Sequence, residues 1–334
     1  MLYSELSEEQ RRQLIDVQQL FDAWRPVDRD MEMSPRLAWH TSKGKRYLYE
    51  KVQGNRKSLG RETPALARRK VENDARMKTL RARVRRLRAR AEEMAPVNKA
   101  VGIARVPLIA ARIIRELDRE GLLGPHIIVA GTNALYAYEM AAGVFVGGRY
   151  TTTTDADLIW DNRHSLLLSA TSVVRRDGLM SILQRVDPTF TADYGMIVRN
   201  DRGYIVDLIV PENEEIAIMR PVGDVEAQPI GNIEWLLTGP AFAQTVVGAD
   251  GLPLRIVVPE PRTFALHKLW VSKQGSRNAL KSVKDASHAR IVCRLAQRNL
   301  GLSMNVKDMP WLPATLKKLL PELKRLARAE EEND

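Results

Sequence analysis

Two aspartates one residue apart, Asp155 and Asp157, place the tightest constraint on how this chain can fold. They follow a run of threonines and precede the apolar residues Leu158 and Ile159, a pattern that predicts the start of a strand. Because side chains alternate along a strand, both carboxylates point to one face, about 7 Å apart along the chain. Two like charges on one face repel each other unless a cation lies between them. Carboxylate oxygens favour a hard cation such as Mg²⁺.

The sequence around this pair alternates between short apolar strands and amphipathic helices. Strands are expected at 126–130, 155–160 and 204–210, and helices at 103–120, 133–142 and 178–186. Gly143, Gly147 and Gly148 predict a loop. This order is typical of an α/β core with a mixed sheet. After about residue 226 the pattern becomes mostly helical, with a helical start at 233–237, a strand at 254–258 and helices at 261–273, 278–299 and 313–331.

The N-terminal part reads as a helix, a basic β-hairpin and a long helix. The first helix is expected at 4–25 and is predicted to stop at Pro26, and strands at 36–60 turn at Gly54-Asn55. A long helix begins after Thr63 and runs to about Met94, and Pro96 marks a linker. Its apolar residues follow a heptad spacing, too short to decide the oligomeric state: Met77, Leu80, Val84, Leu87, Ala91 and Met94.

The division that follows from these patterns has three parts. Residues 1–98 hold the N-terminal helix, basic hairpin and long basic helix, residues 99–225 the α/β core, and residues 226–334 the mostly helical C-terminal part. A single cysteine, Cys293, excludes an intramolecular disulfide. We find no signal-peptide pattern and no apolar run near the ~18 residues that a membrane helix needs. We therefore expect a soluble, cytoplasmic protein without a membrane partner.

The net charge of +11 is concentrated in one segment. Residues 36–90 contain 19 Lys and Arg against 4 Asp and Glu, or +15, whereas residues 1–35 contain 4 against 8, or −4. A local excess of this kind indicates a polyanion site. A solvated helix that docks through its apolar seam is the other interpretation, and both stay open. The candidate nucleic-acid contacts are Lys45, Arg46, Lys51, Arg56, Lys57, Arg81, Arg85 and Arg88.

Two further features accompany the aspartate pair. Gly131-Thr132 lies between an expected strand and an expected helix N-terminus, where free N–H groups favour phosphate. Asp207 stands inside an apolar strand, where a charge is expected to be paired or to bind metal. Pairing with Arg199 is the alternative for Asp207.

The ordered set Gly131-Thr132, Asp155/Asp157 and Asp207 resembles the signature of the nucleotidyltransferase superfamily, which has the DNA polymerase beta-like fold. The resemblance covers about residues 103–210 and is closest to a little-characterised bacterial nucleotidyltransferase-like family. Residues 264–269 and 281–290 resemble the helical segment of abortive-infection and toxin-type nucleotidyltransferases. The basic hairpin resembles the nucleic-acid-binding arms of phage-type integrases over about 25 residues. Thr132 stands where the superfamily more often has Ser.

The resemblance implies roles for individual residues. Asp155, Asp157 and Asp207 would be the catalytic residues and would hold Mg²⁺ or Mn²⁺. Gly131 and Thr132 would hold the phosphates of ATP or another NTP. Lys268 would add a phosphate contact, with Arg149 as a second candidate, although Lys268 also fits an ordinary surface lysine.

These patterns support two hypotheses. In the first, the chain is a metal-dependent nucleotidyltransferase that moves NMP from an NTP to a hydroxyl of RNA, including tRNA, or of protein, and acts as a toxin or phage-defence enzyme. In the second, it is a nucleic-acid-binding protein whose inactive core senses nucleotide. RNA is favoured over DNA as the partner in both.

Overall fold

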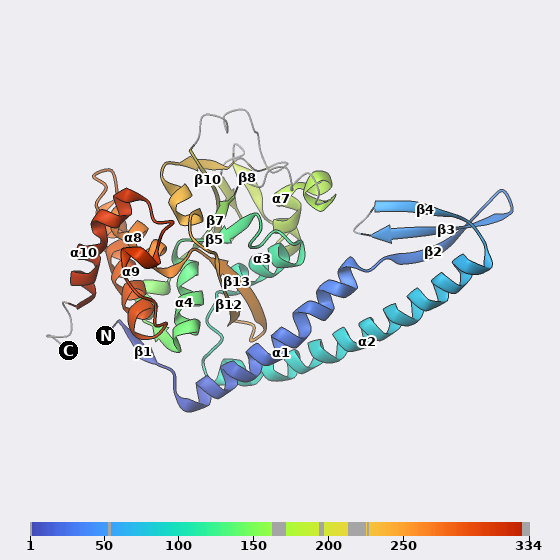
Figure 1. The fold of residues 1–334 in the computed structure, drawn as a ribbon, viewed down its shortest axis with the longest axis horizontal. Coiled ribbons are helices and arrows are strands. Elements are labelled where there is room, and N and C mark those ends of the chain that lie inside the picture. Colours follow the sequence, from blue (N-terminus) through green and yellow to red (C-terminus); the bar gives the residue numbers. More distant parts are fainter. Residues whose placement is uncertain are drawn as a thin grey trace.

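A long arm projects from an α/β core that is flanked on its other side by C-terminal helices (Figure 1). This computed structural model describes residues 2–52, 55–161, 172–193, 197–212, 225 and 227–328. Within those ranges no helix is both long and apolar enough to cross a bilayer.

A mixed sheet forms the centre of the core, as the strand pattern predicts. Its strands run in the order β5-β7-β10-β9-β8, and β11 also pairs with β10. β7 is antiparallel to β5 but parallel to β10, which makes the sheet mixed. The strands are β5 (Ile127–Val129), β7 (Asp155–Trp160), β8 (Thr191–Asp193), β9 (Ile197–Arg199), β10 (Ile205–Pro211) and β11 (Gln228–Ile230).

The helices of the core agree with the expected pattern in type and less closely in their ends. The first begins at Leu108 rather than 103 because Pro107 precedes it. The glycine-containing segment 143–148 is not only a loop, since it contains a strand that pairs with the chain's first strand. The elements are α3 (Leu108–Arg119), η1 (Thr132–Ala134), α4 (Leu135–Ala142), β1 (Tyr3–Glu5), β6 (Val144–Val146), α5 (Gly148–Thr151) and α7 (Ser172–Val186).

The C-terminal part is mostly helical, as expected, and adds a hairpin of which only the second strand was predicted. Glu260 caps the first long helix by accepting a hydrogen bond from the Thr263 N–H at 2.8 Å, and Asn278 caps the second. The elements are η4 (Ile233–Leu237), β12 (Phe242–Val247), β13 (Pro253–Val258), α8 (Pro261–Ser272), α9 (Ala279–Arg298), η5 (Val306–Asp308) and α10 (Ala314–Arg328).

Two long helices that pack against each other form the arm, and a three-stranded antiparallel sheet forms its far end (Figure 1). The predicted heptad seam is confirmed, because Met77, Val84, Ala91 and Met94 are buried. The partner residues Leu14, Val17 and Phe21 of the first helix are buried as well. The arm consists of α1 (Glu8–Met33), β2 (Arg36–Ser42), β3 (Lys45–Val52), β4 (Asn55–Arg61) and α2 (Pro64–Ala100).

The prediction that prolines end both arm helices was wrong. α1 continues past Pro26 to Met33, and α2 continues past Pro96 to Ala100. A proline inside a helix removes one backbone hydrogen bond and costs about 3 kcal/mol. Burial of apolar residues beside each proline, Phe21 and Val27 around Pro26 and Met94 and Ala95 before Pro96, offsets that cost.

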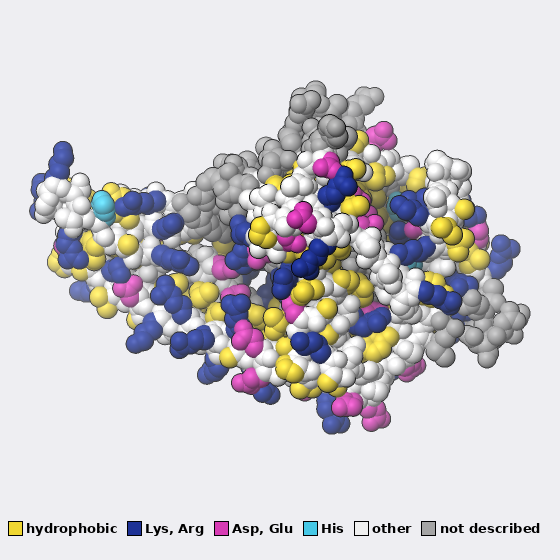
Figure 2. Space-filling model, turned by 180° about the vertical axis from the view of Figure 1, so that it is seen from behind, with side chains coloured by type: hydrophobic (Ala, Val, Ile, Leu, Met, Phe, Trp, Pro, Cys, Tyr) yellow, Lys and Arg dark blue, Asp and Glu magenta, His cyan; other side chains and the backbone are white. Residues whose placement is uncertain are grey.

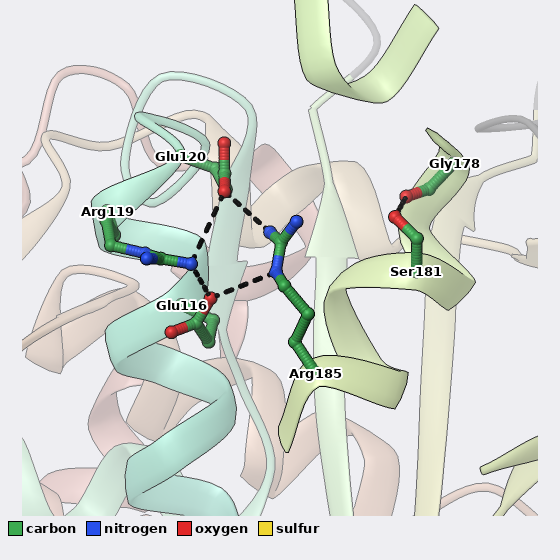
Figure 3. Close-up of polar contacts among 6 residues, drawn as sticks. All are labelled: Glu116, Arg119, Glu120, Gly178, Ser181 and Arg185. Atoms are coloured by element: carbon green, nitrogen blue, oxygen red, sulfur yellow. Dashed lines mark hydrogen bonds and ion pairs between the residues drawn. The ribbon is translucent and has the colours of Figure 1, made fainter. Parts of the chain in front are cut away.

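Ion pairs join the arm and α7 to helix α3 of the core. Arg25 of α1 forms two hydrogen bonds of 2.8 Å with Asp118. Further along α3, Arg185 of α7 reaches Glu116 at 3.3 Å and Glu120 at 2.5 Å (Figure 3). Arg119 lies between the same two carboxylates.

Glu32 of α1 lies close to this acidic end of α3. The pKa of Glu32 is raised from 4.5 to about 7, mainly by burial and also by the charges of Asp28, Glu120 and Glu116, while Arg119 opposes the rise. Between these two values the folded state binds a proton that the unfolded chain has released. Stability therefore falls as the pH rises through this window.

We predict that Glu32→Gln removes much of this pH dependence. Thermal unfolding of the wild type should show a melting temperature that falls between about pH 5 and pH 8. The melting temperature of the variant should fall less over this pH range, and at pH 8 it should be higher than that of the wild type. Asp22→Asn, an exposed change on the same helix, is the control and should leave the slope unaltered. Equal slopes for Glu32→Gln and the wild type would contradict the prediction.

Candidate active site

Three carboxylates lie on one face of the central sheet. Asp155 and Asp157 are two residues apart on β7, so they share a face. β10 runs parallel to β7 in a register that places Asp207 directly beside Asp157. Because neighbouring strands are about 4.8 Å apart, Asp157 and Asp207 are close neighbours.

The turn after β5 is shaped around Asp157. Gly131 has φ +57°, and a Cβ at this position would lie 1.6 Å from Asp157 Oδ2. The carboxylate therefore packs directly against the backbone of the turn, which only glycine permits. The sequence pattern assigned Gly131 to phosphate binding, and the structure adds this second reason for a glycine.

Several polar groups position the start of β7. Asn133 Nδ2 donates to the carbonyl oxygen of Asp155 at 2.8 Å, and the hydroxyl of Tyr204 donates to the same oxygen at 3.2 Å. The hydroxyl of Thr153 donates to Asp155 Oδ1. These contacts fix the backbone that carries the aspartate pair and orient one of its carboxylates.

Burial and the neighbouring carboxylates raise the proton affinity of Asp157 and Asp207. Burial raises the pKa of Asp157 to about 6, with smaller contributions from Asp155 and Asp207, and Lys268 opposes the rise. Burial also raises the pKa of Asp207, assisted by Asp155 and opposed by Lys281. None of the three forms an ion pair within 4.0 Å with a described Lys or Arg. Their mutual repulsion is therefore relieved only by more distant positive charge.

That positive charge comes from α8, α9 and the turn between them. Lys268 Nζ contacts Asp285 Oδ1 at 2.7 Å, and Arg277 contacts Asp285 Oδ2 at 2.7 Å. The buried Asp285 thus holds two cations whose charges both act on Asp157. We call Lys268, Arg277, Lys281 and Lys284 the basic side of the site.

Lys284 joins the basic side to the strand start. Its Nζ donates to the carbonyl oxygen of Thr152 at 2.9 Å, and burial lowers its pKa while the charge of Asp155 acts to raise it. One turn later on the same helix, His288 Nε2 lies 2.8 Å from the carbonyl oxygen of Tyr150. Burial lowers the pKa of His288 to about 3, so the ring is neutral and donates this bond. α9 therefore holds the segment that leads into β7.

The remaining predicted site residues lie in different surroundings. Thr132 is buried at the start of η1, beside Gly131. Arg149 is exposed on α5, and its guanidinium stacks over the Tyr150 ring at 4.8 Å. Arg199 pairs with Asp193, so the alternative in which it neutralises Asp207 is not found.

A family profile described as nucleotidyltransferase matches residues 109–309. This range covers more than half of the 334 residues and includes both the acidic face and the basic side. The chain belongs to this nucleotidyltransferase family. It is an NTP-dependent enzyme of nucleotidyl transfer. Neither a curated protein nor a solved structure matches this nucleotidyltransferase, and the arm residues 8–100 lie outside the family match.

The acidic face of this nucleotidyltransferase suits a divalent cation in its chemistry. Nucleotidyltransferases generally use divalent metals together with the NTP. Asp155, Asp157 and Asp207 offer only oxygen ligands, which hard divalent cations prefer. In the described parts of the chain, however, no three acidic, His or Cys side chains are gathered into a ready metal-binding group.

Sequence reasoning missed several residues of the nucleotidyltransferase site. Asn133 and Tyr204 were not singled out because they act on a backbone oxygen, which no side-chain pattern reveals. Arg277 and Asp285 were missed because their pairing with Lys268 depends on how α8 and α9 pack. The Lys- and Arg-containing stretch 281–290 is visible in the sequence, but only through its resemblance to the helical segment of other nucleotidyltransferases.

We predict that Gly131→Ala destabilises the nucleotidyltransferase through its contact with Asp157. Backbone strain at this φ costs about 1–3 kcal/mol, and the overlap with the carboxylate adds to it. Urea unfolding of Gly131→Ala, Asp157→Ala and the double variant should show a coupling of about 1–2 kcal/mol, because Asp157→Ala removes the overlap.

Gly143→Ala is the matched control for this cycle. Gly143 also has a positive φ, +67°, but a Cβ there meets nothing within 4 Å. Its cost should be about 1–2 kcal/mol from the backbone alone. It should be additive with Asp157→Ala. Additive behaviour at Gly131 as well would contradict the proposed packing.

Proposed function

We propose that this nucleotidyltransferase is metal-dependent and transfers NMP from an NTP, with ATP as the first candidate, to a hydroxyl of RNA. The observation that carries the proposal is one of charge: three carboxylates on adjacent parallel strands face four cations from α8, α9 and their connection. A triphosphate with its divalent cations is a ligand that matches both signs at once.

In this proposal the acidic face holds the metal. Asp155, Asp157 and Asp207 would bind Mg²⁺ or Mn²⁺, which neutralises phosphate oxygens and lowers the pKa of an attacking hydroxyl when bound. The β- and γ-phosphates lie between the turn at Gly131-Thr132 and the basic side. Lys268 would make this contact, and the effect of its charge on the pKa of Asp157 supports that role.

The reaction exchanges one phosphorus–oxygen bond for another. The acceptor hydroxyl oxygen bonds to the α-phosphorus, and the bond from that phosphorus to the β-bridging oxygen breaks, releasing pyrophosphate. Asp207 lies beside Asp157 in the register of β10 against β7, and in this proposal it would take the hydroxyl proton.

A transfer assay tests the proposal. Purified protein with each labelled NTP, Mg²⁺ or Mn²⁺ and total RNA should label RNA. We expect Asp155→Asn, Asp157→Asn and Asp207→Asn each to lower the rate by at least about 10²-fold, as loss of a group acting on the reacting phosphate does. Asp308→Asn, an exposed change on η5, should retain the wild-type rate.

Other outcomes of this assay, and of expression in cells, would indicate a different acceptor or role. Label on protein rather than RNA would replace RNA as the acceptor, and growth arrest on expression that Asp157→Asn abolishes would support a toxin role. Absence of any transfer with full RNA binding would leave the second hypothesis, a nucleic-acid-binding protein that senses nucleotide.

We predict that Lys268→Met raises KM for the NTP about tenfold, because about 1.4 kcal/mol of phosphate binding is lost. Lys273→Met is the matched control. Lys273 follows the same helix and pairs with Glu322 at 2.7 Å, away from the aspartates. If Lys268 acts only as a partner of Asp285, then its loss should lower the melting temperature and leave KM unaltered.

A further inference from the structure

The outward side of α2 carries exposed cations that have no acidic partner. Lys78, Arg81, Arg83, Arg85 and Arg86 are all exposed, and none lies within 4.0 Å of a carboxylate in the described parts of the chain. Unpaired guanidinium groups at this density repel one another, and a polyanion would relieve that repulsion.

Other arginines of α2 form ion pairs with acidic side chains. Arg69 contacts Glu50 of β3 at 3.0 Å, Arg76 contacts Asp30 of α1 at 2.8 Å, and Arg90 contacts Glu93 at 3.0 Å. These three tie the arm together or pair locally. The run of unpaired cations from Lys78 to Arg86 thus lies between the paired Arg76 and Arg88.

The sheet at the end of the arm carries further exposed cations, on the face turned away from α2. Its inner face turns toward α2, because Leu48 is buried and Glu50 meets Arg69. Strand register places the following residues on the opposite, outer face: Arg36, Ala38, His40, Ser42, Lys45, Tyr47, Tyr49, Lys51, Arg56, Ser58 and Arg61. Positive and hydroxyl-bearing side chains dominate it, and no acidic or carboxamide side chain occurs among its described residues.

The space-filling view shows Lys and Arg side chains gathered along the arm (Figure 2). We call the five unpaired cations of α2 together with the outer face of the β2–β3–β4 sheet the outer arm surface. Ala75, Ala82 and Ala89 lie among the cations and are exposed. Small residues there allow a bulky partner to approach the helix closely.

The chemistry of this surface favours a nucleic acid over other acidic partners. A membrane-binding helix buries large apolar residues, whereas here the exposed uncharged positions between Lys78 and Arg86 are Thr79 and Ala82. From Lys78 to Arg86 α2 spans about 12 Å, a length over which a duplex presents about seven phosphate charges. An extended acidic peptide presents only about four carboxylates over the same length.

We infer that the outer arm surface binds double-helical RNA and holds the acceptor whose end receives the nucleotide. This inference rests on the proposed function for the role of the RNA as acceptor. Duplex RNA presents a wide, shallow minor groove with 2′-hydroxyls beside phosphates. A flat sheet face with Ser42, Tyr47, Tyr49 and Ser58 among its cations matches both groups.

The outer face also predicts how sequence affects binding. Asn and Gln, which recognise adenine in DNA, and Asp and Glu, which recognise cytosine, do not occur on it. Arg56 stacks over the Tyr49 ring at 3.9 Å, so this ring is already covered and is not a free platform for an unpaired base. Recognition by shape and charge follows, with little dependence on base sequence.

Fluorescence anisotropy with a labelled RNA hairpin tests the inference. The full-length Asp155→Asn/Asp157→Asn protein is used in EDTA without NTP, so that binding is measured apart from catalysis. We expect affinity to fall steeply as salt rises. The triple variant Lys78→Gln/Arg81→Gln/Arg85→Gln should bind at least about tenfold more weakly and lower the slope of log K against log salt by roughly 2 to 3.

A matched triple variant removes the same charge from the same helix. Arg69→Gln/Arg76→Gln/Arg90→Gln changes only arginines that have acidic partners. It should bind within about threefold of the parent protein, because these cations are neutralised locally. Circular dichroism on both variants establishes that the arm helices remain folded.

Three results would overturn the inference. These are equal losses in the two triple variants, equal or tighter binding of a DNA duplex of the same sequence, and tighter binding of an unpaired RNA strand. Failure of the proposed function appears elsewhere, as absence of nucleotide transfer by the wild-type protein with RNA binding unaffected.

Discussion

The packing of the Asp157 carboxylate against Gly131 is the contact on which the arrangement of the site depends. It fixes the turn after β5 relative to β7, and the parallel register of β7 and β10 then places Asp207 beside Asp157. Because the carboxylate occupies the volume that any Cβ would fill, the acidic face and the predicted phosphate-binding turn form one unit. A change at either residue therefore alters the other.

The acidic face is balanced by charge that comes from far along the chain. Asp285 holds Lys268 and Arg277, and Lys284 bonds to the backbone just before β7. A buried carboxylate that pairs two cations keeps them ordered without consuming the whole of their positive charge. The basic side can thus be held in place and still act on Asp157.

The arm is stabilised by contacts between two long helices, whereas the core is built around a sheet. α1 and α2 are held together by an apolar seam and by ion pairs, and they tolerate Pro26 and Pro96 because buried residues beside each proline maintain the helix. Local sequence rules therefore mispredicted the helix ends. α2 leaves Arg81 and Arg85 exposed and unpaired among the described residues. These two arginines therefore do not contribute to the ion pairs that hold the arm together.

The sequence alone determined the chemical character of this protein. Alternation around Asp155 and Asp157 was enough to predict a strand with both carboxylates on one face, and Gly131, Thr132 and Asp207 in order indicated the family. Only the tertiary structure decided which groups meet. The pairing of Asp285 with Lys268, the two donors to the Asp155 carbonyl and the pairing of β6 with β1 join segments far apart in sequence. Local patterns report the preferences of neighbouring residues, whereas these contacts depend on how separate elements pack.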